Sequence, residues 1–118
     1  MHTGAEAPIR ILHVINVLAV GGMEVGVIKL VNRQDRQRFE PLIGCLRYAT
    51  EDAKALLDPR IRVVTLDKTP GVDWSIVAKL SALFRRERPH IVHSHNWPTF
   101  FYTALAARIA GVPTLIHG

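Results

Sequence analysis

The sequence has very little cysteine, and this scarcity limits its redox setting. Cys45 is the only cysteine among 118 residues, so no disulfide can form within the chain. A chain without internal disulfides favours a reducing environment. We therefore expect a cytoplasmic protein.

Long apolar runs are also missing. No stretch approaches the roughly 20 apolar residues that a membrane-spanning helix needs. Residues 1–8 have neither the basic start nor the apolar run of a secretory signal, and we expect them to be a disordered tail. The remaining chain is long enough for one compact domain, and 48% hydrophobic against 21% charged residues indicates that it folds.

Acidic residues are fewer than basic ones, which gives a formal net charge of +5. This excess suits phosphorylated ligands, anionic lipid or nucleic acid, and equally a plain basic surface. No recognisable nucleic-acid-binding module is present, so nucleic acid is not an expected partner. Arg85, Arg86 and Arg88 close an expected helix that also carries Trp74 and Phe84. They either compensate the helix dipole or make a peripheral contact at the inner face of a membrane.

Two hydrophobic periods alternate along the chain. Runs typical of strands occupy residues 9–15, 39–46, 61–66, 91–95 and 112–116, and helical spacing fills the segments between them. Thr50 and Asp73 are expected N-caps, and Gly111 is an expected C-cap. The alternation predicts a doubly wound, mostly parallel Rossmann-like α/β sheet of about five strands in order 3-2-1-4-5.

Such sheets bind ligands beyond the carboxyl ends of their strands, where the strand order reverses. Here that point lies between the first and fourth strands. The Gly21-Gly22 loop follows the first strand, and the His93–Trp97 segment ends the fourth. Both features should therefore face one crevice.

The glycine pair precedes an expected helix, whose free amides attract phosphate. A tight turn without a ligand is the alternative. The dinucleotide fingerprint is absent because position 23 is Met, and no acidic residue ends the second strand. A nicotinamide cofactor is therefore not expected.

His93 and His95 are two positions apart on one strand, so both should point to the same face, about 6.6 Å apart. His117 ends the neighbouring strand. Three interpretations stay open: His95 contacts a substrate at the crevice edge, the pair binds a metal, or the histidines are structural. No Asp, Glu or Cys accompanies the pair, so we expect no metal. His93 lies deeper in the strand and fits a structural role better than His95. Trp97 stacks on a sugar ring or covers the core.

At these residues the chain resembles the N-terminal domain of family-4 retaining glycosyltransferases of the GT-B fold. The resemblance covers nearly all of the chain after Pro8, and bacterial sugar transferases of exopolysaccharide assembly show the greatest likeness. Four segments carry it: the first strand with Gly21-Gly22-Met23-Glu24, Lys68 with Gly71-Val72-Asp73-Trp74, Arg88–Trp97, and Ala106–Pro113. His90 stands where the family often has Asp, at the start of the strand far from the crevice.

The resemblance implies an enzyme whose front domain binds the acceptor, whose back domain binds the nucleotide sugar, and whose cleft works generally without metal. Gly21 and Gly22 would approach the donor phosphates, and His95 would reach toward the transferred sugar as the catalytic residue. Asn96, Trp97 and His117 would contact acceptor or sugar.

The expected reaction moves a sugar from a nucleoside-diphosphate sugar to a glycan or lipid-linked acceptor with retention, in exopolysaccharide or cell-envelope biosynthesis. No cofactor is implied beyond this co-substrate. Residues 9–118 would be a partial acceptor-side domain without the donor-binding domain, inactive alone and prone to self-association at an open sheet edge. The alternative is a stand-alone module that binds a phosphorylated or glycosylated ligand.

Overall fold

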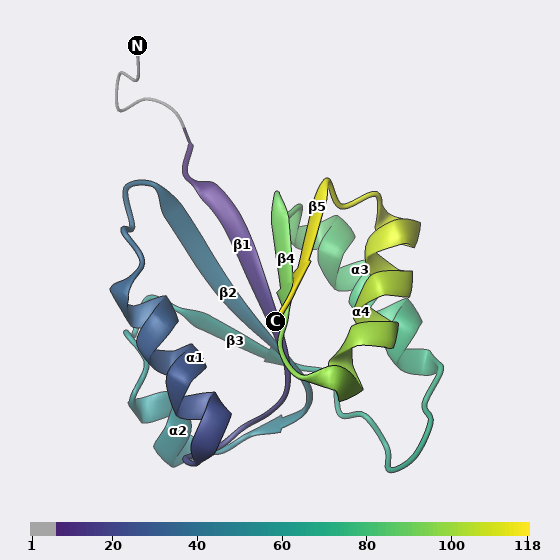
Figure 1. The fold of residues 1–118 in the computed structure, drawn as a ribbon, viewed down its shortest axis with the longest axis horizontal. Coiled ribbons are helices and arrows are strands. Elements are labelled where there is room, and N and C mark those ends of the chain that lie inside the picture. Colours follow the sequence, from purple (N-terminus) through teal and green to yellow (C-terminus); the bar gives the residue numbers. More distant parts are fainter. Residues whose placement is uncertain (1–6) are drawn as a thin grey trace.

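The computed structural model describes residues 7–118, except for the side chains of residues 22–24. The expected disordered tail therefore lies mostly outside the described residues, and Ala7 and Pro8 have no regular secondary structure. The described chain forms one parallel sheet with helices on both faces (Figure 1). No helix in residues 7–118 is long and apolar enough to cross a membrane.

Strands and helices alternate along the whole chain, as the sequence predicts. The elements are β1 (Ile9–Leu18), α1 (Gly22–Arg33), β2 (Phe39–Ala49), α2 (Glu51–Ala55), β3 (Arg62–Thr65), α3 (Ser75–Glu87), β4 (Ile91–Ser94), α4 (Trp97–Ala110) and β5 (Thr114–His117). Neighbouring strands are parallel, in the order β3-β2-β1-β4-β5. The predicted fold class and strand order are confirmed.

The alternation of side chains along β1 divides the core into two clusters. Leu12 and Val14 pack with residues of α3 and α4. Ile15 and Leu18 pack with residues of α1 and α2 on the other face. Figure 1 shows α1 and α2 beside β2 and β3, and α3 and α4 beside β4 and β5. The sheet is thus buried on both faces around β1, as parallel sheets require.

Local sequence signals set several helix ends. The Thr50 hydroxyl accepts a hydrogen bond from the Ala53 N–H at 3.4 Å, which confirms Thr50 as the N-cap of α2. Gly111 adopts φ +73° at the C-cap of α4, also as predicted. The prediction for Asp73 is wrong by one residue. Trp74 is the N-cap of α3, while a carboxylate oxygen of Asp73 accepts the Ser75 N–H at 3.1 Å.

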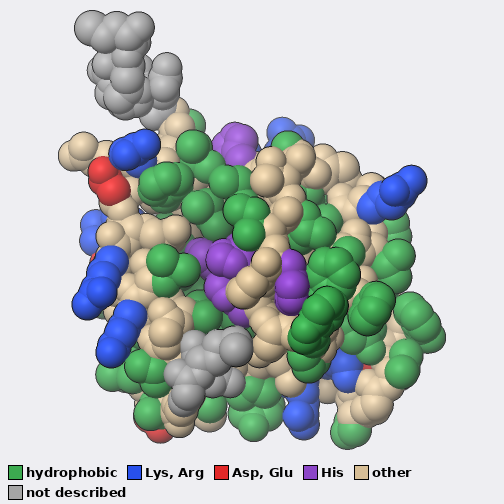
Figure 2. Space-filling view, viewed as in Figure 1, with side chains coloured by type: hydrophobic (Ala, Val, Ile, Leu, Met, Phe, Trp, Pro, Cys, Tyr) green, Lys and Arg blue, Asp and Glu red, His purple; other side chains and the backbone are tan. Residues whose placement is uncertain are grey.

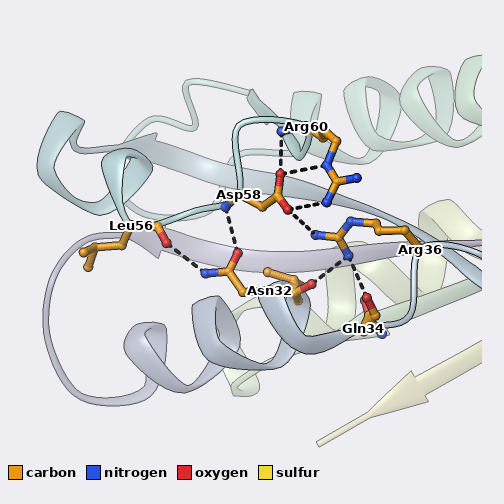
Figure 3. A network of polar contacts seen from close by, with 7 residues as sticks. Asn32, Gln34, Arg36, Leu56, Asp58 and Arg60 are labelled. Carbon is orange, nitrogen blue, oxygen red and sulfur yellow. Dashed lines mark hydrogen bonds and ion pairs between the residues drawn. The ribbon is translucent and has the colours of Figure 1, made fainter.

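A polar network joins α1 to the turn before β3 (Figure 3). The Asn32 amide nitrogen donates to the Leu56 carbonyl at 2.8 Å, and its oxygen accepts the Asp58 N–H at 2.8 Å. The Asp58 carboxylate pairs with Arg60 at 2.8 Å and with Arg36 at 3.6 Å. These contacts fix α1 and α2 on their face of the sheet.

Candidate active site

The site lies where the strand order reverses, at the carboxyl ends of β1 and β4. The two strands are hydrogen-bonded neighbours, and the His95 N–H continues their pairing by donating to the Val14 carbonyl at 2.9 Å. In the view of Figure 2, histidine side chains gather near the centre of the visible face of the molecule.

Three histidines from two adjacent strands make up this cluster. His13 of β1 is in register with His93 of β4, so the two side chains share one sheet face, and His95 follows on the same face. Their ring centroids lie 5.5 Å apart for His13 and His93, 5.3 Å for His13 and His95, and 4.0 Å for His93 and His95. His13 Nδ1 and His95 Nε2 are 3.0 Å apart, a hydrogen bond in which one ring must be the donor.

Burial makes this cluster uncharged at neutral pH. It lowers the pKa of His13 to about 3, with the neighbouring His95 and His93 acting in the same direction. It lowers the pKa of His95 to about 4, helped by His93 and His117. Burial also lowers the pKa of His93. Neutral imidazoles can each donate one hydrogen bond and accept another, which suits contact with sugar hydroxyls.

The relative depths of His93 and His95 differ from the sequence-based interpretation. His95 is the buried one at 6% exposure, whereas His93 is half-buried. The reason is that His95 lies over β1 and against His13, while His93 faces a part of the sheet next to the exposed Ile116 of β5. A structural role is therefore no more fitting for His93 than for His95.

His13 is a member of the site that the sequence-based reasoning missed. It is 1% exposed, and its Nε2 is buried without a hydrogen-bond partner in the described part of the chain. The available signal was a histidine with two apolar residues on either side of it in the first strand. Its meaning depends on the register between β1 and β4, which the sequence does not show.

Nitrogen atoms of the three histidines lie within 4.8 Å of one another, so a transition metal is a chemical alternative. Within the described residues no carboxylate or thiol joins this cluster. The direct bond between His13 and His95 already gives two of the rings a partner. That the site holds no metal stays a prediction.

Asn96 stands at the entrance of α4 in a backbone conformation that is rare for a residue with a side chain. Its φ is 61° and its ψ is 155°, a region occupied almost only by glycine. Its side-chain oxygen is buried and has no hydrogen-bond partner among the described residues. Strain together with an unsatisfied polar atom at a strand end marks Asn96 as a candidate contact residue.

Trp97 and His117 lie together, but on a different side of the sheet from His95. His117 is in register with Ser94, whose side chain faces α4, and its Nδ1 is 2.6 Å from the Ser94 hydroxyl. The Trp97 ring is 5.0 Å from the His117 ring, and Trp97 is 68% exposed. An exposed Trp97 contradicts the interpretation that it covers the core. The predicted contacts thus form two groups on either side of the strand end.

Gly21 is the N-cap of α1, and Gly22 is the first residue of that helix. Gly21 has an extended backbone with φ 161°, and a Cβ there would meet nothing within 4 Å. The backbone conformation at Gly21 does not require glycine. The close approach of a ligand to the backbone is therefore the remaining reason for a glycine at this position. The surroundings of Gly22 lie outside the described residues. The predicted phosphate contact is untested.

The fold, with the histidine cluster at its switch point, defines a class, the Rossmann-like half of a GT-B protein. One solved structure with this fold is the UDP-GlcNAc 2-epimerase from Neisseria meningitidis bound to UDP-GlcNAc. It aligns with a TM-score of 0.60 and 17% identity over 90% of this chain and 30% of that chain. That likeness shows the fold. No curated protein matches the sequence. The family model described as Glycosyltransferase Family 4 matches residues 20–118, and the chain belongs to that family.

Proposed function

We propose that this chain is the acceptor-side part of a retaining glycosyltransferase that uses a nucleoside-diphosphate sugar. The observation that carries the proposal is His95, a neutral imidazole at the switch point of a family-4 chain. The strained Asn96 beside it adds a second polar group at the same strand end. Because the chain spans 30% of the solved structure it matches, the activity is proposed for the whole protein.

In the proposed reaction the bond between the sugar C1 and the diphosphate oxygen breaks. A bond from C1 to an acceptor hydroxyl oxygen forms, and the hydroxyl proton leaves with the nucleoside diphosphate. His95 would hold a sugar hydroxyl through its ring, with Nε2 fixed by His13. Its contribution is positioning, since a neutral imidazole carries no charge with which to balance the leaving group.

The other roles follow the same proposal. Gly21 and Gly22 approach the donor phosphates at the start of α1, and Asn96, Trp97 and His117 contact the sugar or the acceptor. The acceptor is a glycan or a lipid-linked molecule of exopolysaccharide or cell-envelope assembly, reached from the cytoplasm at the inner face of the membrane. We expect the 118-residue chain by itself to release no nucleotide, because one open face does not exclude water from the reacting groups.

His95→Gln in the complete enzyme tests this function. A glutamine keeps a polar atom near the position of Nε2 for the bond to His13 but cannot reproduce the imidazole ring. Turnover should fall by about 100-fold, as expected for a lost positioning group. UDP sugars are the first donors to try, because the epimerase of similar fold is bound to one.

The melting temperature of the same variant separates function from folding. His93→Gln is the matched control, since His93 shares the face but makes no bond to His13. Near-normal turnover of His95→Gln, or an equal loss in both variants, would show that His95 is not the catalytic residue. Absence of nucleotide release with every donor in the wild-type enzyme would instead favour the stand-alone binding module.

A further inference from the structure

Two hollows lie side by side near the candidate site, and they differ in chemistry. One, of about 370 Å³, is polar and is lined by Asn16, Arg47, Lys68, Pro70, Gly71, Pro98 and Tyr102. The other, of about 470 Å³, is apolar and is lined by Val72, Trp74, Trp97, Pro98, Phe101 and Tyr102. Pro98 and Tyr102 belong to both linings, so the two hollows form one continuous surface.

The polar hollow carries positive charge only. Lys68 and Arg47 line it, and no acidic side chain among the described residues is part of its lining. The Lys68 ammonium donates to the carbonyls of Thr69 and Gly71, which leaves one of its three N–H donors. Within the described part of the chain, neither Lys68 nor Arg47 pairs with a carboxylate. These two cations are suited to a phosphate.

The loop between β3 and α3 holds this hollow in shape. The Tyr102 hydroxyl accepts the Asp73 N–H at 3.1 Å, and the Lys68 ammonium lies 5.7 Å from the Tyr102 ring centroid. The two acids of that loop, Asp67 and Asp73, are not part of the lining, and Asp73 accepts hydrogen bonds from Thr69 and Ser75. The cation is thus positioned over the side chain that joins the two hollows.

The apolar hollow exposes large side chains that folding alone would bury. Trp74, Trp97 and Phe101 are 69%, 68% and 69% exposed, from two different helix starts. Exposed aromatic groups gathered on one surface mark a binding site rather than ordinary surface composition. A free sugar would leave most of this surface in water, whereas a hydrocarbon chain would cover it.

We infer that the acceptor is a phosphorylated lipid, whose phosphate lies between Lys68 and Arg47 and whose hydrocarbon chain covers Trp74, Trp97 and Phe101. The positively charged hollow matches the phosphate of such a molecule, and the apolar hollow beside it matches the hydrocarbon chain. The polar hollow reaches β1 through Asn16 and the start of α4 through Pro98. A headgroup held there lies at the start of α4, the helix that Asn96 caps. The inference rests on the proposed function and narrows its acceptor to this class.

The chain contains a built-in reporter for the test, because its two tryptophans, Trp74 and Trp97, both line the apolar hollow. Titration of the 118-residue chain with dodecyl phosphate below its micelle concentration should shift the tryptophan emission to shorter wavelength and saturate. Dodecyl maltoside, with the same hydrocarbon chain and no phosphate, should bind at least about tenfold more weakly, as expected for the loss of a charge-assisted contact. Inorganic phosphate alone should leave the emission unchanged.

Variants assign the two halves of the site. Lys68→Gln with Arg47→Gln should weaken dodecyl phosphate by about tenfold or more and leave dodecyl maltoside unchanged. Phe101→Ser should weaken both ligands. Lys29→Gln with Arg33→Gln, exposed on α1, is the charge-matched control and should change neither.

Three results would overturn the inference. The first is equal affinity for dodecyl phosphate and dodecyl maltoside, and the second is unchanged binding of dodecyl phosphate by the double Lys68 and Arg47 variant. The third is binding only to phosphatidylglycerol vesicles, which would make the surface a membrane contact. This binding test is independent of turnover. Nucleotide release by the complete enzyme, together with no binding of dodecyl phosphate, would refute the inference and leave the proposed function standing.

Discussion

At the scale of single residues, Asn96 has both strain and an unsatisfied atom, and the two can be separated by substitution. A residue with a side chain at φ 61° and ψ 155° carries strain that glycine does not. Asn96→Gly should therefore stabilise the 118-residue chain by about 1 kcal/mol. Asn96→Ala, which removes the side-chain oxygen but keeps the strain, should stabilise it less. Urea denaturation of the two variants measures the difference.

The same substitution has the opposite effect on activity if Asn96 contacts a substrate. In the complete enzyme, Asn96→Gly should lower turnover while raising the melting temperature, since the amide oxygen is then lost. A variant that gains stability with unchanged turnover would show that the strain has no functional purpose.

The histidine cluster makes stability depend on pH in a defined window. Each of the three pKa values is lowered on folding, so the unfolded chain binds protons that the folded chain does not. Their contribution to stability is present above about pH 6.5, the ordinary histidine pKa, and is lost as the pH falls toward 4 and then 3. Between pH 6.5 and 5 carboxylates contribute little, because their ordinary pKa values are about 4.

His13→Gln tests this assignment. Removal of the His13 imidazole should reduce the pH dependence of the unfolding free energy by up to about 1.4 kcal/mol per pH unit, which is the value for one bound proton. Urea denaturation at several pH values between 5 and 6.5 gives the two slopes. Equal slopes in the wild type and the variant would mean that His13 binds the same number of protons in the folded and unfolded states, so that folding does not lower its pKa.

At the scale of elements, Asn32 joins α1 to the turn that leads into β3. Its side chain makes one hydrogen bond as donor and one as acceptor, both to backbone groups (Figure 3). Asn32→Ala should lower the free energy of unfolding by about 1 to 2 kcal/mol. Lys29→Ala on the exposed surface of the same helix is the control and should cost less than about 0.5 kcal/mol. Similar losses of unfolding free energy in both variants would show that the two hydrogen bonds of Asn32 contribute nothing beyond the difference in helix propensity.

The order of the elements could be predicted because each strand and helix has its own hydrophobic period. The ends of β1 and β2 could not. Both strands continue three residues beyond their apolar runs, to Leu18 and Ala49, where they pair again after an irregularity. Asn16, Arg47 and Tyr48 interrupt the period there, so local sequence indicates a loop while the neighbouring strand stabilises an extended chain.

The candidate site divides in the same way. His93 and His95 could be placed on one face because residues two apart on a strand always share it. The position of His13 opposite His93, and of His117 opposite Ser94, depends on strand register. Packing rather than residue spacing determines that register. The sequence alone therefore suggested His117 as the third histidine of the cluster, whereas in the structure His13 is the histidine bonded to His95.

At the scale of the whole molecule, the sheet has one edge with consequences for the 118-residue chain in solution. β5 pairs with β4 on one side, and no strand in residues 7–118 pairs with its other side. Ile116 of this strand is 44% exposed and pairs with His93 of β4 in the strand register. An open edge with an exposed apolar side chain is a template for pairing with a second chain.

We therefore expect the 118-residue chain to form dimers or larger assemblies as its concentration rises. Ile116→Lys should make it monomeric, because a lysine on an edge strand opposes pairing with a second copy through charge. Ile109→Lys is the matched control: Ile109 is 55% exposed on α4, away from the β5 edge, so the same change there should leave assembly intact. Size-exclusion chromatography with light scattering over a concentration series gives the masses of all three proteins. A monomeric wild type, or equal dissociation by both lysine variants, would mean that the β5 edge does not join chains and that general surface hydrophobicity is the cause of any association seen.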